Sequence, residues 1–437
     1  MNQSIWREGA ELPRFPEAQG DMQTDVLIIG GGLCGILCAY FLEWAGVDYI
    51  LAEAGRIGQG ITGSTTAKVT AQHGLLYSRL MREAGREKAQ LYLAANQDAL
   101  ERYTQLCQNI DCDFERKAAY TYSLTDRQAL EDEARAVRTL GGEAEYVEKL
   151  PLPFGTAGAV KMRCQAQFHP LKFLAGVSKG LRIFENTRIT ELGPKTAVYG
   201  NGKITAKKMI VTTHFPFLNK HGGYFAKLYQ YRSYVLALEN APKLDGMFVD
   251  AEQNGLSFRC SQDLLLVGGG GHRTGKQGGN WKALRRFAQR YYPDARERCA
   301  WATQDCMSLD GIPYIGQYSG ATPDLYVAAG FNKWGMTTSM AAALLLRDMV
   351  MERENEYEPL FSPQRSMRKR QLLANGLEAV HDLLIPSDKR CPHLGCALQW
   401  NAAEHSWDCP CHGSRFDITG KLIDNPATGG ARIAGKV

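Results

Sequence analysis

Four cysteines and two histidines near the end of the chain form a pattern that could bind a metal. The candidate ligands are Cys391, His393, Cys409 and His412, spaced as Cys-x-His and Cys-x-x-His. Two thiolates and two imidazoles are a set that zinc accepts. Each half of the pattern also holds a further cysteine, Cys396 or Cys411, and zinc does not explain this second pair. The sequence therefore predicts a metal centre here and leaves the metal open.

A glycine pattern near the N-terminus predicts a dinucleotide site. Gly30, Gly32 and Gly35 directly follow the apolar run 26–29, which is typical of a buried parallel strand, and they open a helix. Gly30 permits a tight turn, Gly32 lets the backbone approach a pyrophosphate, and Gly35 lets helix and strand pack closely. Glu53 ends a second apolar run, 18 residues after Gly35, where an acid can accept hydrogen bonds from ribose hydroxyls.

Two polar segments are expected to complete this site. Residues 54–68 are small and hydroxyl-rich without periodicity, so their amides and hydroxyls could surround a phosphate or a flavin edge. Residues 330–337 follow an apolar run and open a long helix, which places a helix N-terminus and a lysine near the ligand. The further residues predicted to contact the cofactor are Ala54, Arg56, Thr62, Ser64, Thr65, Thr66, Ile189, Gly330, Phe331, Lys333, Trp334, Gly335, Met336 and Thr337.

Composition excludes several classes of protein. With 437 residues, 44% hydrophobic and 22% charged, the chain is typical of a soluble protein with two or three units. The net charge is only +5 and the basic residues are dispersed, so no nucleic-acid partner is expected. No stretch approaches 18 apolar residues and no secretion signal is evident, so we expect no integral membrane segment. The remaining cysteines are scattered, which suits a reducing cytoplasm.

Apolar spacing predicts the elements that position these residues. Helices are expected over 85–108, 126–140, 171–179, 281–291 and from the 330–337 turn to residue 351, and an amphipathic one over 371–385. Strands are expected over 119–124, 182–186, 204–213, 231–238, 247–250, 256–260, 264–267 and 325–329. The glycine run 268–271 does not match the dinucleotide pattern, so a second nucleotide site is not expected there.

Over roughly residues 4–355 these motifs resemble the FAD-dependent oxidoreductases of the D-amino acid oxidase and glycine oxidase superfamily, closest to its γ-glutamylputrescine oxidase-like members. The resemblance implies an α/β fold: a Rossmann-like FAD-binding domain (1–80, 155–225 and 300–352) with an inserted antiparallel-sheet substrate domain (81–154 and 226–299). It also places Cys306 near the position where some relatives attach FAD covalently, so Cys306 is either a flavin link or a buried free thiol. Where sarcosine-oxidase-like members hold a carboxylate-binding lysine, this chain has Thr337, which argues against an α-amino acid substrate.

The C-terminal pattern resembles a Rieske [2Fe-2S] domain. The resemblance implies that Cys391 and Cys409 bind one iron, that His393 and His412 bind the other, and that Cys396 and Cys411 form a disulfide. The module, 387–437, is a small, truncated all-β unit after a helical linker, 353–386. High-potential relatives have a serine and a tyrosine that donate to sulfur. Here Ser414 is present but Phe416 replaces the tyrosine, so we expect an intermediate potential.

We therefore expect an FAD-dependent oxidoreductase that acts on a CH–NH or CH–OH group of a small amine, amino acid or hydroxy acid. Electrons would pass from the flavin through the cluster to an external acceptor, a protein or a quinone-like molecule. Two alternatives stay open: a redox-sensing or electron-transfer flavoprotein without small-molecule turnover, and an oxygen-dependent oxidase with a vestigial Rieske tail. Candidates for a catalytic side chain are His169, His272 and Lys333, although hydride transfer needs mainly a well-positioned substrate.

Overall fold

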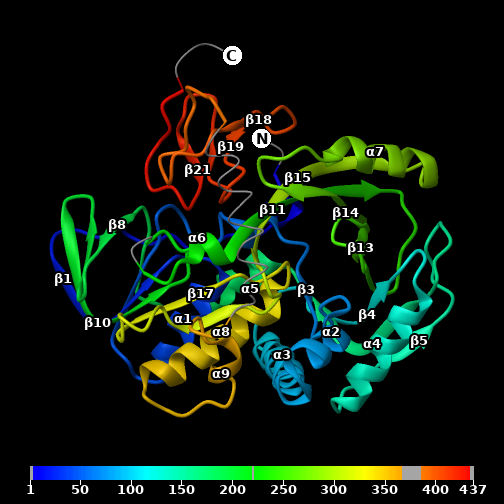
Figure 1. Ribbon diagram of the computed structural model, residues 1–437, viewed down its shortest axis with the longest axis horizontal. Helices are drawn as coiled ribbons and strands as arrows, with labels where there is room; N and C mark the ends of the chain where they lie inside the picture. The colour runs from blue at the N-terminus through cyan, green and yellow to red at the C-terminus, as the bar shows by residue number, and fades with distance from the viewer. Residues whose placement is uncertain (1–2, 219–220, 367–384, 434–437) are drawn as a thin grey trace.

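The protein is described by a computed structural model that covers residues 3–218, 221–366 and 385–433 (Figure 1). Its first sheet is built around β1 (Met22–Ile29), the strand that leads into the glycine pattern. β1 lies between β2 (Tyr49–Ala52) and β10 (Gly202–Val211) and is parallel to both. Residues 26–29 are all buried, because alternate side chains of the strand enter two different cores on its two faces.

The order of strands in this sheet is β16-β17-β10-β1-β2-β7, with β9 and β8 attached beside β10. All neighbours along this path are parallel except β16 and β17. The carboxyl ends of the parallel strands therefore meet at one edge, where open α/β sheets bind their ligands. The strands not yet given are β7 (Ile183–Phe184), β8 (Ile189–Leu192), β9 (Thr196–Tyr199), β16 (Tyr314–Gln317) and β17 (Leu325–Ala329).

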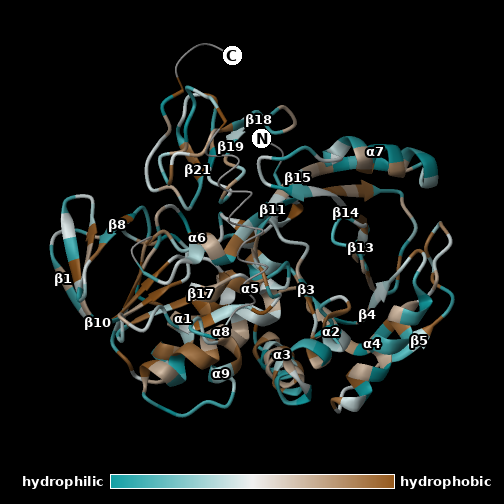
Figure 2. Ribbon diagram, viewed as in Figure 1, coloured by the Kyte–Doolittle hydropathy of each residue, from teal (hydrophilic) through white to brown (hydrophobic). Residues whose placement is uncertain are grey.

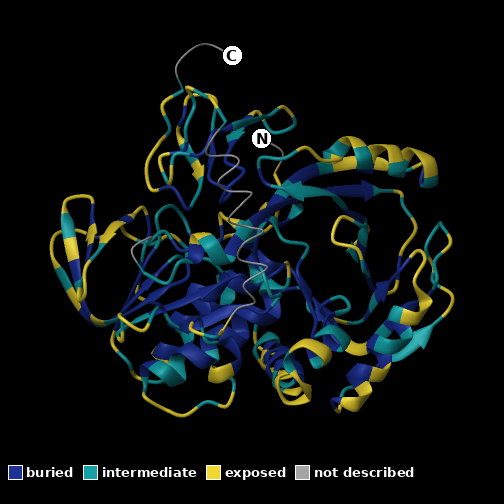
Figure 3. Ribbon diagram, in the orientation of Figure 1, coloured by how far each residue is buried: buried dark blue, intermediate teal, exposed yellow. Residues whose placement is uncertain are grey.

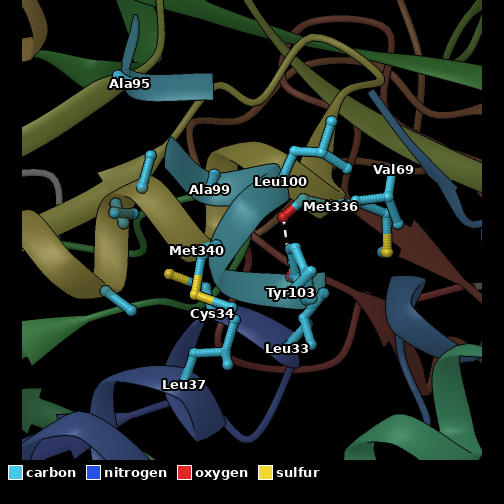
Figure 4. Packing of buried hydrophobic residues seen from close by; sticks show 14 of the residues in the cluster. Leu33, Cys34, Leu37, Val69, Ala95, Ala99, Leu100, Tyr103, Met336 and Met340 are labelled. Carbon is cyan, nitrogen blue, oxygen red and sulfur yellow. Dashed lines mark hydrogen bonds between the residues drawn. The ribbon is translucent and has the colours of Figure 1, made fainter. Parts of the chain in front are cut away.

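Two helices, α1 (Leu33–Trp44) and α8 (Gly335–Val350), pack against the first sheet, and a third, α3 (Arg86–Cys107), packs on α8. α1 also contacts α8. In Figure 4, Cys34 and Leu37 of α1 lie close to Met340 of α8, and the Tyr103 hydroxyl of α3 donates to the Met336 carbonyl oxygen over 2.9 Å. α1 and α8 carry a larger share of apolar residues than α3, which is partly teal in Figure 2, as expected if α1 and α8 are buried on several sides. The core thus fixes the start of α8, which follows the 330–337 turn.

The second sheet has nine strands, in the order β15-β11-β14-β13-β12-β4-β6-β3 with β5 beside β6. The prediction of an antiparallel sheet needs one correction, because β12 and β4 are parallel. These two strands come from distant parts of the chain, so no hairpin requires them to run in opposite directions. The strands are β3 (Lys68–Val69), β4 (Glu115–Tyr122), β5 (Glu145–Val147), β6 (Ala159–Gln167), β11 (Leu228–Glu239), β12 (Met247–Asp250), β13 (Ser257–Ser261), β14 (Leu264–Arg273) and β15 (Arg296–Ser308).

Four segments join the second sheet in ways the sequence did not indicate. β6 and its partner β3 lie within 155–225 and 1–80, ranges expected in the first domain, yet β6 also pairs with β4 and both belong to the second sheet. β15 was not predicted as a strand and crosses the expected boundary at residue 300. β14 continues through the glycine run instead of ending at Val267. Glycine is needed there because a Cβ on Gly270 would collide with the backbone of Asn280, at the start of the helix that covers the sheet.

The predicted helices over 85–108, 126–140, 171–179 and 281–291 are confirmed within a few residues as α3, α4 (Arg127–Thr139), α5 (Pro170–Val177) and α7 (Asn280–Tyr291). Figure 3 shows the outer side of α7 in yellow, as expected for an amphipathic surface helix. The helix predicted over 371–385 falls almost wholly outside the described residues. Short elements complete the set: η1 (Ile5–Arg7), η2 (Ile61–Ser64), α2 (Leu76–Ala84), α6 (Tyr224–Lys227) and α9 (Glu358–Phe361).

The C-terminal module is a small antiparallel sheet of four strands in sequence order, β18 (Gln399–Asn401), β19 (Ser406–Asp408), β20 (Arg415–Phe416) and β21 (Leu422–Asp424). Figure 1 shows it, in orange and red, above β11 and β15 of the second sheet. Its core is small and contains all four cysteines of the module. Within the described residues, no helix is both long and apolar enough to cross a bilayer.

Candidate functional site

A cavity of ≈ 1000 Å³ lies where the two sheets and the C-terminal module meet. The first sheet contributes the β1–α1 turn, Glu53 and the residues after β10. The second sheet contributes residues of β11, β14 and β15. The module contributes residues 423–425, 427 and 428. One cavity thus joins the predicted nucleotide site to the predicted metal module.

The glycine turn has the shape that a pyrophosphate needs. A Cβ on Gly35 would collide with the Gly30 carbonyl oxygen, so close packing of helix and strand requires glycine there. A Cβ on Gly32 would meet only the Thr62 hydroxyl, at 3.6 Å, and its side of the turn is open to the cavity. Glu53 accepts hydrogen bonds from the N–H groups of Gly31 (2.6 Å) and Gly55 (2.7 Å), which fix its carboxylate at the cavity wall. These residues fit FAD, because they leave open space where the pyrophosphate must approach the backbone.

This geometry predicts that Gly32→Ala folds normally but binds FAD poorly. The added methyl has room in the protein itself, but it occupies the space through which the pyrophosphate reaches the helix N-terminus. We expect a loss of FAD affinity of roughly 10- to 100-fold, as for a lost hydrogen bond to a charged group. The dissociation constant is measured by adding FAD back to stripped protein. Gly155→Ala is the control, because nothing lies within 4 Å of a Cβ there and Gly155 does not line the cavity. Unchanged FAD affinity in Gly32→Ala would contradict the placement of the pyrophosphate at this glycine turn.

Residues 63–67 turn their carbonyl groups away from the cavity. The carbonyl of Gly63 accepts from the Ser4 hydroxyl, that of Ser64 from the Trp301 indole (2.9 Å), and that of Thr65 from the Trp6 indole (2.6 Å). The guanidinium of Arg259 donates to the carbonyls of residues 66 and 67 at 2.8 and 2.9 Å. The N-terminal arm and the second sheet therefore hold this loop from behind. The side chains of Thr65 and Thr66 are left to line the cavity.

Most of the residues predicted to contact the cofactor line this cavity. Three do not: Gly35 packs against Gly30, Ser64 does not reach the cavity, and Thr337 hydrogen bonds to His73 (3.2 Å) and the Thr70 carbonyl (3.1 Å). The predicted residues that line it are Gly30, Gly32, Glu53, Ala54, Arg56, Thr62, Thr65, Thr66, Ile189, Cys306, Gly330, Phe331, Lys333, Trp334, Gly335 and Met336.

The three candidate catalytic residues lie in different places. His169 is the N-cap of α5, where its Nδ1 accepts from the Lys172 N–H (3.2 Å), and its ring packs against Trp6. His272 bonds to the Tyr234 hydroxyl at 2.9 Å. Neither is among the residues that line the cavity. Lys333 does line it.

Lys333 is held by the second sheet. Its Nζ donates to the Gln253 carbonyl oxygen (2.8 Å) and lies 4.2 Å from the centre of the Tyr231 ring. The neighbouring Asp305 also lines the cavity, and burial raises its pKa to about 6 although Lys333 opposes the shift. Burial lowers the pKa of Lys333, and the nearby carboxylate of Asp305 opposes this shift. Cys306 is a buried free thiol whose pKa burial raises to about 12, so it is not an activated nucleophile in the protein alone.

Two cavity residues carry no sequence signal of their own. His73 stacks on Trp334 with ring centroids 4.8 Å apart, and its Nδ1 bonds to the Tyr92 hydroxyl at 2.8 Å. Burial lowers the pKa of His73 to about 3, so it is neutral. Lys68 reaches the cavity from β3, next to Ser257 of β13. Both lie just beyond the hydroxyl-rich loop, where only the fold shows which side chains turn inward.

The metal ligands predicted in the module converge. The Cys391 and Cys409 thiols are hydrogen bonded to each other, and the rings of His393 and His412 are 4.9 Å apart at 82°. His412 is buried, and within the described part of the chain its Nδ1 has no hydrogen-bond partner, as expected of a nitrogen reserved for a metal. These four groups fit a Rieske cluster.

The two remaining cysteines of the module are joined. Cys396 and Cys411 form a disulfide, 15 residues apart in the chain. Their sulfur atoms also lie within 4.8 Å of a ring nitrogen of His412. Oxidised sulfur atoms in a disulfide cannot act as thiolate ligands, so this trio is not a separate metal site. The bond instead connects the two loops that carry the ligands.

Hydrogen bonds surround the ligand sulfur atoms. Bonds from the Cys409 thiol, the His393 N–H and the Ser414 hydroxyl lower the pKa of Cys391 to about 7, against the effect of burial. The Ser414 oxygen also accepts from the Ala427 N–H at 2.9 Å. Phe416 is fully buried and has no polar atom to offer. One side-chain donor therefore faces the cluster site, which supports the prediction of an intermediate potential.

Side-chain amides dock the module onto β11 and β15. Gln230 donates to the carbonyls of His412 (3.0 Å) and Asn425 (2.9 Å). Gln304 donates to the Gly413 carbonyl (3.0 Å) and to Gln230 (2.6 Å). Asn425 in turn donates to the backbone after β10, at the carbonyls of residues 213 (2.6 Å) and 215 (2.8 Å). The module is thus bonded to the second sheet and to the backbone that follows β10 of the first.

A buried group of charges lies beside these amides. Glu404 of the module pairs with Arg232 of β11 and, at 2.8 Å, with Arg415 of its own sheet. Arg415 also pairs with Asp408 (3.0 Å) and Asp424 (3.1 Å). All but Asp424 are nearly inaccessible to solvent. Because buried charges need partners, this network strongly favours the docked position.

Comparison with known proteins assigns both parts of the chain. A model of the family described as "FAD dependent oxidoreductase" matches residues 25–349. The chain belongs to this family. A second family model, "Rieske [2Fe-2S] domain", matches residues 371–434. The protein is therefore an FAD-dependent oxidoreductase with a C-terminal Rieske domain, and its cofactors are FAD and a [2Fe-2S] cluster.

Relatives agree with this assignment. The Rieske 2Fe-2S iron-sulfur protein YhfW of Bacillus subtilis is 35% identical, over 97% of this chain and 96% of that protein. The cytochrome b6-f complex iron-sulfur subunit 1 of Nostoc sp. is 60% identical over 56 residues, which are 13% of this chain and 30% of that subunit. Glycine oxidase from Geobacillus kaustophilus shares the fold, with a TM-score of 0.66 at 19% identity, over 79% of this chain and all of that one.

Proposed function

We propose that this oxidoreductase oxidises a small amine, amino acid or hydroxy acid and delivers the electrons through its Rieske centre to an external acceptor. FAD supplies a two-electron acceptor that can also release electrons singly, and a [2Fe-2S] cluster carries one electron at a time. The observation that carries the proposal is the shared cavity. Residues 423–425, 427 and 428 of the module line the same cavity as the FAD-binding glycines. A module that served no redox purpose would have no need to be docked there.

The residues of the chain have separate tasks in this proposal. Glu53, Gly32 and the 60–66 loop bind FAD, and the second sheet encloses the substrate. Gln230 holds the loop of His412, and Asn425 bonds the module to the backbone after β10. Since hydride transfer depends mainly on orientation, the sheet and the 330–337 turn act by positioning the substrate and excluding water. A strong base is not required of His73, which is neutral and held by Tyr92.

The position of Lys68 favours carboxylic acids over simple amines as substrates. Its Nζ lines the cavity, 3.1 Å from the Thr66 hydroxyl and 3.4 Å from the Ser257 hydroxyl. Burial and the nearby Arg259 lower the pKa of Lys68 to about 7. Across residues 3–218, 221–366 and 385–433 no carboxylate forms an ion pair with it, and a buried ammonium group favours an anionic partner. A substrate carboxylate would be that partner. Lys68 would then bind the carboxylate, as a lysine does in the sarcosine-oxidase-like members at the position that Thr337 occupies here.

We expect Lys68→Met to weaken the binding of carboxylates on the order of 100-fold and to leave neutral ligands unaffected, because a buried charge loses its partner. Binding is measured from the flavin absorbance during titration with acetate or lactate, and with acetamide or lactamide as neutral counterparts. Lys68→Arg keeps the cation and should retain much of the affinity. Lys207→Met is the control, since Lys207 is exposed and paired with Asp25. Equal loss for acids and amides would argue against a carboxylate site.

The proposed function is tested without oxygen. Protein with both cofactors quantified is mixed with a panel of amines, amino acids and hydroxy acids, while flavin absorbance and the electron paramagnetic resonance signal of the reduced cluster are recorded. We expect one compound to bleach the flavin and a Rieske signal to follow. Reduction of the flavin by a partner reductase but by no panel compound would instead indicate an electron-transfer protein. Full-rate hydrogen peroxide production after loss of the cluster would indicate an oxidase.

A further inference from the structure

The two histidine ligands of the cluster lie in opposite environments. His412 is 3% exposed, and its carbonyl accepts a hydrogen bond from Gln230. The rings of Phe215 and Phe225 lie edge-on to it, with centroids at 6.3 and 6.2 Å. Phe215 and Gln230 belong to the flavoprotein part of the chain and not to the module. His412 therefore faces the flavoprotein part of the chain.

His393 faces the other way. It is only half-buried, and its neighbours in the chain, Pro392 and Leu394, are both exposed. Leu394 is one of the few large apolar side chains of the described residues that are exposed, at 41%. Gln230, Gln304 and the Arg232–Glu404 pair hold the module on β11 and β15 in the orientation that keeps His412 facing the flavoprotein part of the chain.

From this asymmetry we propose that the cluster receives electrons on its His412 side and releases them on its His393 side. This inference rests on the proposed function and gives it a direction. For each substrate oxidised, two electrons leave the reduced flavin one at a time, and its protons pass to solvent. Each electron reduces the cluster across the contact made by Phe215 and Gln230. An external one-electron acceptor at the surface around Leu394 then oxidises the cluster, so two acceptor molecules are reduced per substrate.

Changes on the receiving side should slow only the first transfer. In Gln230→Met the His412 loop loses a hydrogen bond, and in Phe215→Leu it loses a ring contact. We expect the flavin-to-cluster rate to fall on the order of 10-fold, because small misplacements near a reacting pair have effects of this size. The rate is measured after a light flash reduces the flavin through a deazaflavin, without any substrate. The g values and amplitude of the dithionite-reduced cluster should stay unchanged, which shows that the cluster is intact.

Changes on the releasing side should alter only the second transfer, and the charge introduced should decide the sign. With Leu394→Glu we expect slower reduction of ferricyanide and faster reduction of hexaammineruthenium(III), each by roughly 2- to 10-fold at low ionic strength. Leu394→Lys should show the reverse. Ile418→Glu is the control, since Ile418 is a 55% exposed residue of the same module away from the ligands.

The outcomes separate this inference from the function it rests on. If the wild-type flavin never reduces the cluster, the proposed function fails. If the wild-type flavin does reduce the cluster, but the Leu394 variants change the reduction rates of the two acceptors no more than Ile418→Glu does, the assignment of the releasing side is wrong. If Gln230→Met and Phe215→Leu both transfer electrons to the cluster at the wild-type rate, the receiving side is wrong.

Discussion

Replacing Cys409 by serine is expected to abolish the cluster while the protein still binds FAD. Cys409 is completely buried, and its sulfur faces the N–H groups of Cys411 and His412. A serine cannot supply the thiolate that the iron requires. The FAD site should persist, because its glycines, Glu53 and the 60–66 loop belong to other parts of the chain. We therefore expect no iron and no Rieske signal, a flavin that is still reduced by substrate, and loss of nearly all turnover with one-electron acceptors.

Cys164→Ser is the matched control, because Cys164 is a free, exposed cysteine of the second sheet. It should keep iron, flavin and turnover at wild-type levels. Wild-type rates of acceptor reduction in Cys409→Ser would mean that electrons leave the flavin directly. The Rieske domain would then have no part in turnover.

Replacing Glu404 by alanine is expected to loosen the Rieske domain from the rest of the protein. The substitution leaves the side chains of Arg232 and Arg415, 4% and 6% exposed, as two buried positive charges without their shared partner. Breaking a buried pair in this way typically costs about 3–5 kcal/mol. We expect the visible absorbance of the cluster to disappear at lower denaturant concentration than in the wild type. The flavin transition should shift much less.

Asp245→Ala removes a comparable contact from an exposed position. Asp245 pairs with Lys117 at 2.9 Å but is 93% exposed, and exposed pairs contribute about 0–1 kcal/mol. Its unfolding curves should therefore match those of the wild type closely. Equal stability of Glu404→Ala and Asp245→Ala would show that the buried charges do not hold the domain in place.

The parts of the site that could be predicted are those encoded by neighbouring residues. Gly30, Gly32 and Gly35 act within one turn, and Cys391 and His393 within one loop, so their spacing carries the geometry. The 330–337 turn was also recognisable, because a strand, a glycine and a helix start follow one another. In each case the residues are so close in the sequence that the local backbone alone brings them together.

The residues that could not be predicted depend on contacts between distant strands. Gln230 and Gln304 are 74 residues apart, yet they form one docking surface because β11 and β15 are neighbours. The sequence did not predict β15 as a strand, because both of its faces carry polar residues. One face lies toward the cavity and the other toward the Rieske domain. Lys68 looked like the end of a polar loop. Only the second sheet, which places Ser257 beside it, shows that it turns into the cavity.

The central claim is that electrons pass from the flavin to the cluster inside one chain. The most direct test reduces the flavin rapidly without oxygen and freezes samples at successive times for electron paramagnetic resonance, at several protein concentrations. We predict that the Rieske signal grows as the reduced flavin decays, with a rate constant that does not depend on protein concentration. A cluster that stays oxidised beside a fully reduced flavin, or a rate that rises with concentration, would contradict the account.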